Sequence, residues 1–83
     1  MGLILDCKQQ QTTNSMEKYY VNKQAKLNGD HEVHREDCLY LPTQSNRIHI
    51  GIHSNCEDAV TEAKKTFSHS NGCKKCSSEC HTR

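Results

Sequence analysis

The sequence predicts an α+β domain: a short antiparallel sheet of about three strands with one helix packed on it. Three observations lead to this fold class. A β-rich run is followed by a turn signal and a second short run, an alternating isoleucine segment comes later, and a stretch with helical spacing follows directly. The chain has 83 residues, 33% hydrophobic residues, one Phe and no Trp. A core this small contributes only roughly 3–5 kcal/mol to the free energy of folding, so we expect a disulfide or a bound metal ion to stabilise the fold as well.

The first residues predict no structure. Residues 8–15 are rich in Gln, Thr and Asn and show no apolar period, so we expect residues 1–16 to be a disordered leader. Met16 is a candidate internal start of translation, and Cys7 would then have no structural role. Residues 17–83 form the single small domain that the length allows.

Two of the expected strands form a hairpin. Residues 19–23 (Tyr-Tyr-Val-Asn-Lys) are a β-rich run, and residues 28–30 (Asn-Gly-Asp) are a turn signal because Asn and Gly tolerate positive φ. Residues 31–35 are the partner strand. Strand alternation places Val33 on one face and both Glu32 and His34 on the other.

The third strand is expected at residues 47–53, after Pro42 and a loop at 43–46. Apolar and polar residues alternate there, which is typical of a half-buried strand. The residues expected on the core face are Ile48, Ile50 and Ile52, and those expected on the outer face are Arg47, His49 and His53.

A helix follows this strand. Ser54 and Glu57 have the spacing of a capping box, with Ser54 as the N-cap. Residues Cys56, Ala59, Val60, Ala63 and Phe67 then lie on one helical stripe, which we expect to pack on the isoleucine face. Acids in the first turn and Lys64 and Lys65 in the last would suit the helix dipole.

The chain also contains two short clips of metal-type ligands. His34 and Cys38 form the first and Cys73 and Cys76 the second, with 34 residues between the clips. One imidazole and three thiols are the ligand set of a closed tetrahedral Zn²⁺ site. Because the clips flank the third strand and the helix, one ion would tie the hairpin to the C-terminal end and staple the fold.

Other uses of the cysteines remain open. Cys56 lies on the apolar stripe and is expected to be a buried small hydrophobe. Cys80 and His81 extend the second clip and are alternative ligands, and a Cys76–Cys80 disulfide is a further alternative. The absence of a secretory signal or an apolar run that could span a membrane favours a cytoplasmic protein with reduced thiols. A disulfide-stapled binding protein from an oxidising compartment is the competing hypothesis.

The two clips and the segment between them resemble a known family. The pattern His-x-x-x-Cys at 34–38, a strand through residues 46–50, an Ala-containing helix and Asn-Gly-Cys-Lys-Lys-Cys at 71–76 is similar to the zinc-binding domain at the N-terminus of the Ada DNA-methylation repair protein. The likeness covers roughly residues 31–78. It is greater to small relatives whose first clip reads Val-His-x-x-x-Cys. The resemblance implies the fold and zinc ligation by Cys38, Cys73 and Cys76. In the Ada domain the first ligand is a methyl-accepting cysteine, and His34 stands there in this chain.

These features predict a small zinc-binding module whose site is structural and whose role is to bind a partner, and we expect no enzyme. The competing enzymatic hypotheses are alkyl transfer to Cys38 and thiol-redox chemistry at Cys73 and Cys76. Charge favours nucleic acid as the partner, since residues 64–83 carry a net +4 and residues 1–63 a net −3. The candidate phosphate contacts are Lys64, Lys65, Lys74 and Lys75. Another protein is the alternative partner, and no membrane is expected.

Overall fold

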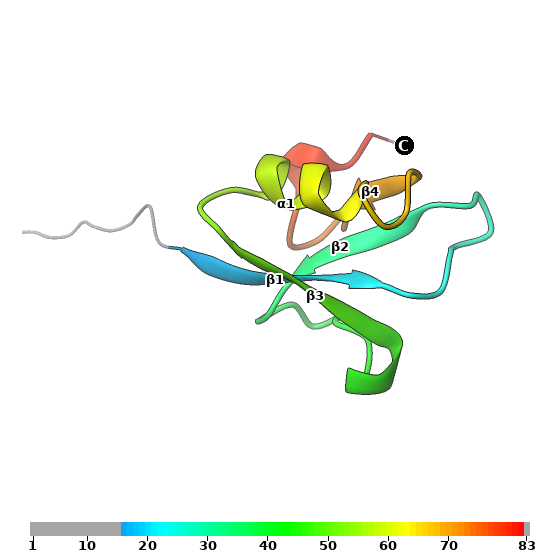
Figure 1. Cartoon of the computed structure of the whole chain (residues 1–83), viewed down its shortest axis with the longest axis horizontal. Coiled ribbons are helices and arrows are strands. Elements are labelled where there is room, and N and C mark those ends of the chain that lie inside the picture. The colour runs from blue at the N-terminus through cyan, green and yellow to red at the C-terminus, as the bar shows by residue number, and fades with distance from the viewer. Residues whose placement is uncertain (1–15, 83) are drawn as a thin grey trace, which may run out of the picture.

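The computed structural model describes residues 16–82 and forms a four-stranded mixed sheet there, with one helix packed on it. The elements are β1 (Glu17–Asn22), β2 (His31–Arg35), the 3₁₀ turn η3 (Gln44–Asn46), β3 (Arg47–His53), α1 (Cys56–Ala63), β4 (Ser70–Gly72) and the 3₁₀ turn η4 (Ser78–Cys80). The strand order is β3-β1-β2-β4. Figure 1 shows α1 on one face of the sheet and the β2–β3 connection on the other. The α+β class is confirmed; the predicted leader, apart from Met16, lies outside the described residues.

The predicted hairpin is present. β1 and β2 pair antiparallel, with Val21 opposite Val33 and Tyr20 opposite His34. Gly29 in the connecting turn has φ 92°, a left-handed conformation that favours glycine. Val21 and Val33 are both fully buried, so the hairpin contributes the centre of the core.

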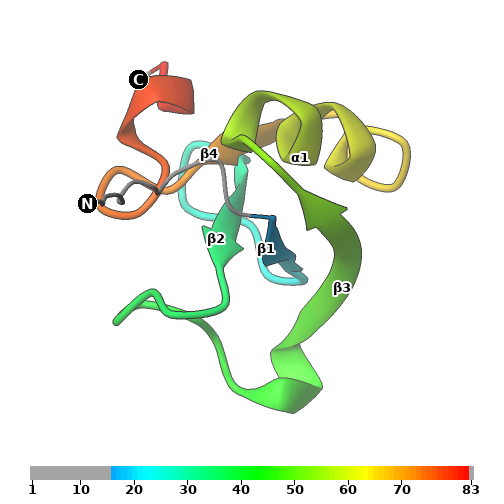
Figure 2. The same ribbon diagram turned by 90° about the vertical axis from the view of Figure 1, so that its left-hand side faces the viewer.

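The sheet has a fourth strand that the sequence did not indicate. β4 is only Ser-Asn-Gly and runs parallel to β2, with His31 opposite Ser70 and Val33 opposite Gly72. These residue types have low strand propensity, so tertiary pairing places them in the sheet. Figure 2 shows β4 next to the end of β2 and close to α1. The parallel pair makes the sheet mixed, where an antiparallel one was expected.

A β-bulge interrupts the alternation of β3. Tyr20 pairs with His49 and Tyr19 with Gly51, so Ile50 is an extra residue, and Gly51 adopts φ 106°. Ile48 and Ile50 therefore pack on the core as predicted, but Ile52 is 52% exposed. The prediction for His53 was also wrong, because its ring lies 6.0 Å from that of the buried Tyr19.

The helix begins one residue later than predicted and is short. Its N-cap is Asn55, whose side chain accepts a hydrogen bond from the backbone N–H of Asp58, so the expected role of Ser54 is not observed. The helix ends at Ala63, which leaves Lys64 and Lys65 beyond its last turn. Phe67 also lies past the helix, but it packs against the core and stacks on His31 with 3.8 Å between ring centroids.

The core lies between α1 and the sheet. Its buried members are Tyr19, Val21, Val33, Ile50, Cys56, Ala59 and Ala63. The two alanines are fully buried, which lets the helix approach the strands closely. This core contains few large side chains, in agreement with the composition.

A disulfide joins Cys56 to Cys80, 24 residues apart. It links the first residue of α1 to the η4 turn. Cys56 is buried on the apolar stripe as expected, but it also forms a disulfide that was not predicted for it, and the alternative Cys76–Cys80 pairing was wrong. Metal and disulfide were expected to be alternatives. The structure instead contains one disulfide together with free thiols at Cys38, Cys73 and Cys76.

Candidate metal centre

The fold brings the two predicted clips together. His34 lies in β2 and Cys38 in the turn after it, while Cys73 and Cys76 lie in the turn that follows β4. One ligand atom from each of the four residues lies within 4.8 Å of all the others. Because β4 pairs with β2, the second clip begins directly beside the strand that carries the first. Residues from two segments far apart in the sequence thus form a Cys₃His cluster that could hold a metal ion.

The spacing of the ligand atoms suits a tetrahedral ion. The Sγ atoms of Cys38 and Cys73 are 3.8 Å apart, and Cys76 Sγ lies 3.9 Å from His34 Nδ1. Two sulfurs bound tetrahedrally to zinc at 2.3 Å each lie about 3.8 Å apart. The cluster therefore has nearly the size that zinc requires.

Each of the three sulfurs also accepts a backbone N–H. The donors are Tyr40 to Cys38 at 3.4 Å, Lys75 to Cys73 at 3.4 Å and Arg35 to Cys76 at 3.3 Å. Such hydrogen bonds disperse the negative charge of thiolates and fix their orientation. Two local turns and the end of β2 thus orient the three sulfurs for ligation.

Glu32 lies behind the His34 ring, on the side away from the thiols. His34 is 1% exposed, and its Nδ1 faces the thiols. Its Nε2 is buried without a hydrogen-bond partner in the described part of the chain, and the nearest acid oxygen, Glu32 Oε1, is 3.6 Å away. A carboxylate behind a metal-bound imidazole fixes its ring orientation and raises its basicity. Glu32 was not identified as a site residue, although strand alternation had placed it on the face of His34.

The thiols share charge unequally. Burial raises the pKa of Cys38 to about 12, assisted by its contact with Cys76. Burial also opposes the charge of Cys76, but hydrogen bonds from His34, Cys38 and the Arg35 N–H lower its pKa to about 6. Crowded sulfurs resist ionising together, and a divalent cation removes this repulsion.

The alternative ligands do not join the cluster. Cys80 is in the disulfide, and His81 Nδ1 lies 3.0 Å from the carbonyl oxygen of Gly72. A Cβ on Gly72 would lie 2.6 Å from the Ser77 carbonyl oxygen, so glycine lets this turn fold back onto β4. The C-terminal residues therefore support the site without contributing ligands.

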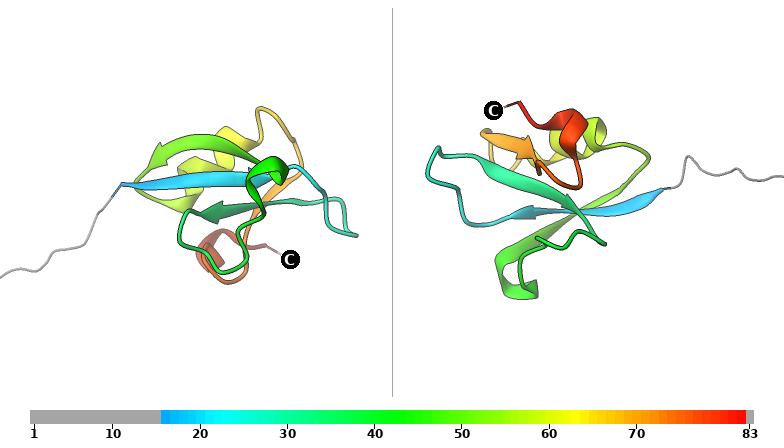
Figure 3. Two further views of the ribbon diagram at one scale, coloured as in Figure 1. Left: turned by 90° about the horizontal axis from the view of Figure 1, so that it is seen from below. Right: turned by 180° about the vertical axis from the view of Figure 1, so that it is seen from behind.

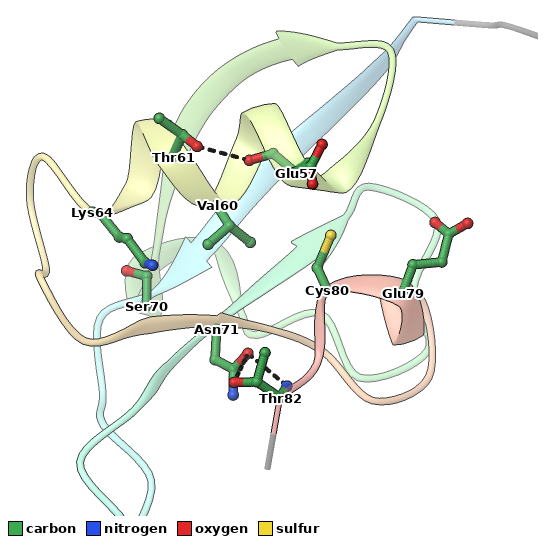
Figure 4. Close-up of a pocket in the computed structure, with 9 residues that line it drawn as sticks. All are labelled: Glu57, Val60, Thr61, Lys64, Ser70, Asn71, Glu79, Cys80 and Thr82. Atoms are coloured by element: carbon green, nitrogen blue, oxygen red, sulfur yellow. Dashed lines mark hydrogen bonds between the residues drawn. The ribbon is translucent and has the colours of Figure 1, made fainter.

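The four candidate phosphate-binding lysines are exposed but lie at different places. Lys64 lines a hollow between α1 and the C-terminal segment that also contains Glu57 and Glu79 (Figure 4). Lys75 lines a separate hollow that contains Cys38 and Cys76. The lysines do not line one shared hollow within the described residues.

Comparisons with protein-family models, curated proteins and solved structures find no match to this chain. The resemblance to the Ada domain thus stays a prediction. Between residues 16 and 82, no helix has the length and apolar character needed to cross a bilayer.

Proposed function

We propose that this protein is a small zinc-binding module whose Cys₃His site stabilises the fold. The observation that carries the proposal is the convergence of His34, Cys38, Cys73 and Cys76, each sulfur already accepting a backbone N–H. Zinc is the favoured ion because three thiolates and one imidazole at tetrahedral spacing match its preferences. The resemblance to the Ada domain supports the same ion.

A structural role follows from the number of ligands. Four protein ligands complete a tetrahedron and leave no position for water or substrate. Bound zinc would supply a cross-link and neutralise the thiolates. His34 and Cys73 would hold it from the buried side, while Cys38 and Cys76 would close it from the partly exposed side. Glu32 would orient the imidazole of His34.

The proposed activity of the module is to bind a partner, and nucleic acid is the partner we propose. The basic C-terminal part of the chain and the resemblance to a DNA-repair domain support this choice. The candidate phosphate contacts are Lys64, Lys65, Lys74 and Lys75. A second protein is the alternative partner.

Metal analysis tests the zinc site directly. Protein purified without a metal-affinity resin should contain one zinc per chain, and its circular dichroism melt should lose cooperativity after chelation and regain it when zinc is returned. His34→Cys should keep one zinc because it supplies another tetrahedral ligand, whereas His34→Ala should weaken binding. Unchanged cooperative melting after complete metal removal would refute the structural role.

A thiol count addresses the compartment. Disulfides such as Cys56–Cys80 persist in oxidising compartments, whereas the reduced thiols that the proposed zinc site needs are typical of the cytoplasm. The cytoplasmic location stays a proposal. Denatured, metal-free protein should show four reactive thiols of the six cysteines if the bridge is present and six if the compartment keeps it reduced.

Alkyl transfer to Cys38 is a second candidate function. Cys38 is partly exposed and lines a hollow of about 350 Å³ with Arg35 and Lys75, which could hold a phosphotriester. In the step, the sulfur would form a bond to the methyl carbon, the C–O bond would break, and a phosphodiester would leave. Mass spectrometry after exposure to a methyl-phosphotriester duplex tests it: a methyl group on Cys38 supports transfer, and no mass increase excludes it.

A further inference from the structure

The face of the sheet opposite α1 has a hollow of about 340 Å³. Its lining residues are Lys18, Tyr20, Gln44, Arg47 and His49. They come from β1, β3 and the η3 turn, which lie together in the view from below in Figure 3. None of these residues belongs to the Cys₃His cluster, so the hollow is a separate feature of the molecule.

Flat side chains in this hollow are held in a defined arrangement. Tyr20 pairs with His49 across β1 and β3, and their ring centroids lie 5.2 Å apart. The Arg47 guanidinium lies 4.7 Å from the centre of the Tyr20 ring, and its Nη1 donates a 2.9 Å hydrogen bond to the Pro42 carbonyl oxygen. The three groups therefore form a platform with little freedom left to lose on binding.

The charge of the hollow is positive. Lys18 and Arg47 line it, and no acidic residue of the described chain does. Lys18 Nζ lies 3.9 Å from the carboxylate of Glu36. Both side chains are half exposed, so this ion pair is weak. In contrast, the hollow beside Lys64 contains two glutamates. This hollow combines cations with aromatic rings, whereas no aromatic residues are interleaved with the four C-terminal lysines.

We propose that single-stranded nucleic acid binds in this hollow on the face of the sheet opposite α1. Phosphates would contact Arg47 and Lys18, and a base would stack on the exposed His49 ring beside Tyr20. A single strand fits better than a duplex because the bases of a duplex keep their faces stacked inside. The inference rests on the proposed function, since it names the surface through which the zinc-stabilised module binds its partner.

Fluorescence anisotropy of the metal-loaded full chain tests this surface. The probes are labelled single strands of about ten nucleotides, one of DNA and one of RNA to compare the two sugars, and the same DNA sequence as a duplex. Single strands should bind more tightly than the duplex, and added salt should weaken them. His49→Ala and Arg47→Gln should each weaken binding roughly fivefold or more, the loss expected for one stacking or phosphate contact.

Matched controls separate this surface from the C-terminal lysines. Two double variants serve as controls: Lys64→Gln/Lys65→Gln and Lys74→Gln/Lys75→Gln. Each should change the affinity for single strands less than His49→Ala does. His49→Ala removes an exposed ring and leaves the core intact. The inference is overturned if no single strand binds, if the duplex binds as tightly, or if only the lysine variants lose affinity.

Zinc content and thermal unfolding of every variant keep the two proposals distinct. Folded, zinc-loaded protein that binds no oligonucleotide would overturn this inference and leave the zinc site intact. Cooperative folding and oligonucleotide binding in zinc-free protein would instead overturn the structural role of the metal.

Discussion

Two regions of this small domain are stabilised in different ways. The sheet of β1, β2 and β3 with α1 encloses apolar side chains, with Val21, Val33 and Ala59 fully buried. The C-terminal segment, residues 70–82, buries residues without any large apolar side chain, namely Ser70, Asn71, Gly72, Cys73 and Ser77. Burial of such groups stabilises little by itself, so this segment depends on specific bonds.

Besides the backbone pairing of β4 with β2, three kinds of side-chain connection hold the C-terminal segment. The Cys₃His cluster joins it to β2, the Cys56–Cys80 disulfide joins it to α1, and Asn71 joins it to both the hairpin turn and the chain end. The cluster needs reduced sulfurs and the disulfide needs oxidised ones, so either can be removed without the other. A weakly apolar segment can thus be secured by several specific bonds of different chemistry.

Loss of a metal ligand should have the largest effect. Cys73→Ser removes a buried residue of the proposed zinc site, and the lost zinc binding should cost at least about 5 kcal/mol, as much as the apolar core supplies. Circular dichroism should show no cooperative melt, and mass spectrometry of the metal should show less than one zinc per chain. Cys7→Ser, predicted to lie in the leader, is the matched control, and equal loss in both variants would contradict a specific site.

Loss of the disulfide should have the next largest effect. Replacing Cys56 and Cys80 together by Ala opens a loop of 24 residues and should lower the free energy of unfolding by about 3 kcal/mol. Urea unfolding with zinc present measures the change. Zinc content should stay at one per chain because neither residue is a ligand in the proposed site; a parallel loss of zinc would show that the two connections are not independent.

Loss of the Asn71 contacts should have a smaller effect. Its side chain donates to Asp30 at 3.2 Å and accepts from the Thr82 N–H at 3.1 Å, and Figure 4 shows Asn71 and Thr82 together. Asn71→Ala should destabilise the domain by about 2 kcal/mol because buried partners lose hydrogen bonds. Asn55→Ala, which removes only the cap of α1, should cost about 1 kcal/mol. Thermal unfolding compares them, and a reversed order would contradict the dependence of the C-terminal segment on Asn71.

Acid should weaken the metal-dependent connection and leave the disulfide unchanged. The raised pKa of Cys38, about 12, means that zinc displaces its proton near neutrality, so affinity should fall at least tenfold per pH unit as pH decreases. The lowered pKa of Cys76, about 6, keeps this thiolate ionised until pH falls below 6, where a second proton competes and the slope steepens. Zinc titrations with a competing chelator between pH 5 and 8 measure this pH dependence of the affinity. Each tenfold change corresponds to ~1.4 kcal/mol of binding free energy. A pH-independent affinity would contradict thiolate ligation.

Sequence patterns predicted the parts of this molecule that local chemistry determines. The hairpin follows from the Asn-Gly turn, and the ligand clips follow from their spacing, which the β2–β4 pairing brings together. β4 was missed because Ser-Asn-Gly forms a strand only when β2 is beside it. Ile52 was misplaced because a bulge at Gly51 shifts the alternation, and a single strand gives no sign of its partner's register.

The disulfide and the helix start were missed for a related reason. Cys56 has the spacing of a core residue, and nothing in the sequence indicates that the η4 turn approaches the first turn of α1. Ser54 and Asn55 are both good N-caps, and the structure selects Asn55. Spacing therefore predicts candidates, while long-range packing decides among them.

The parallel pairing of β2 with β4 also determines the order in which the chain can fold. His31 and Ser70 are neighbours in the sheet, so a long intervening segment must close before they meet, and contacts of such sequence separation form slowly. The hairpin can form early from local contacts. Ligand residues from the two clips meet only after this closure, so the rate at which refolding protein brings all four of them together should report this slow step of assembly.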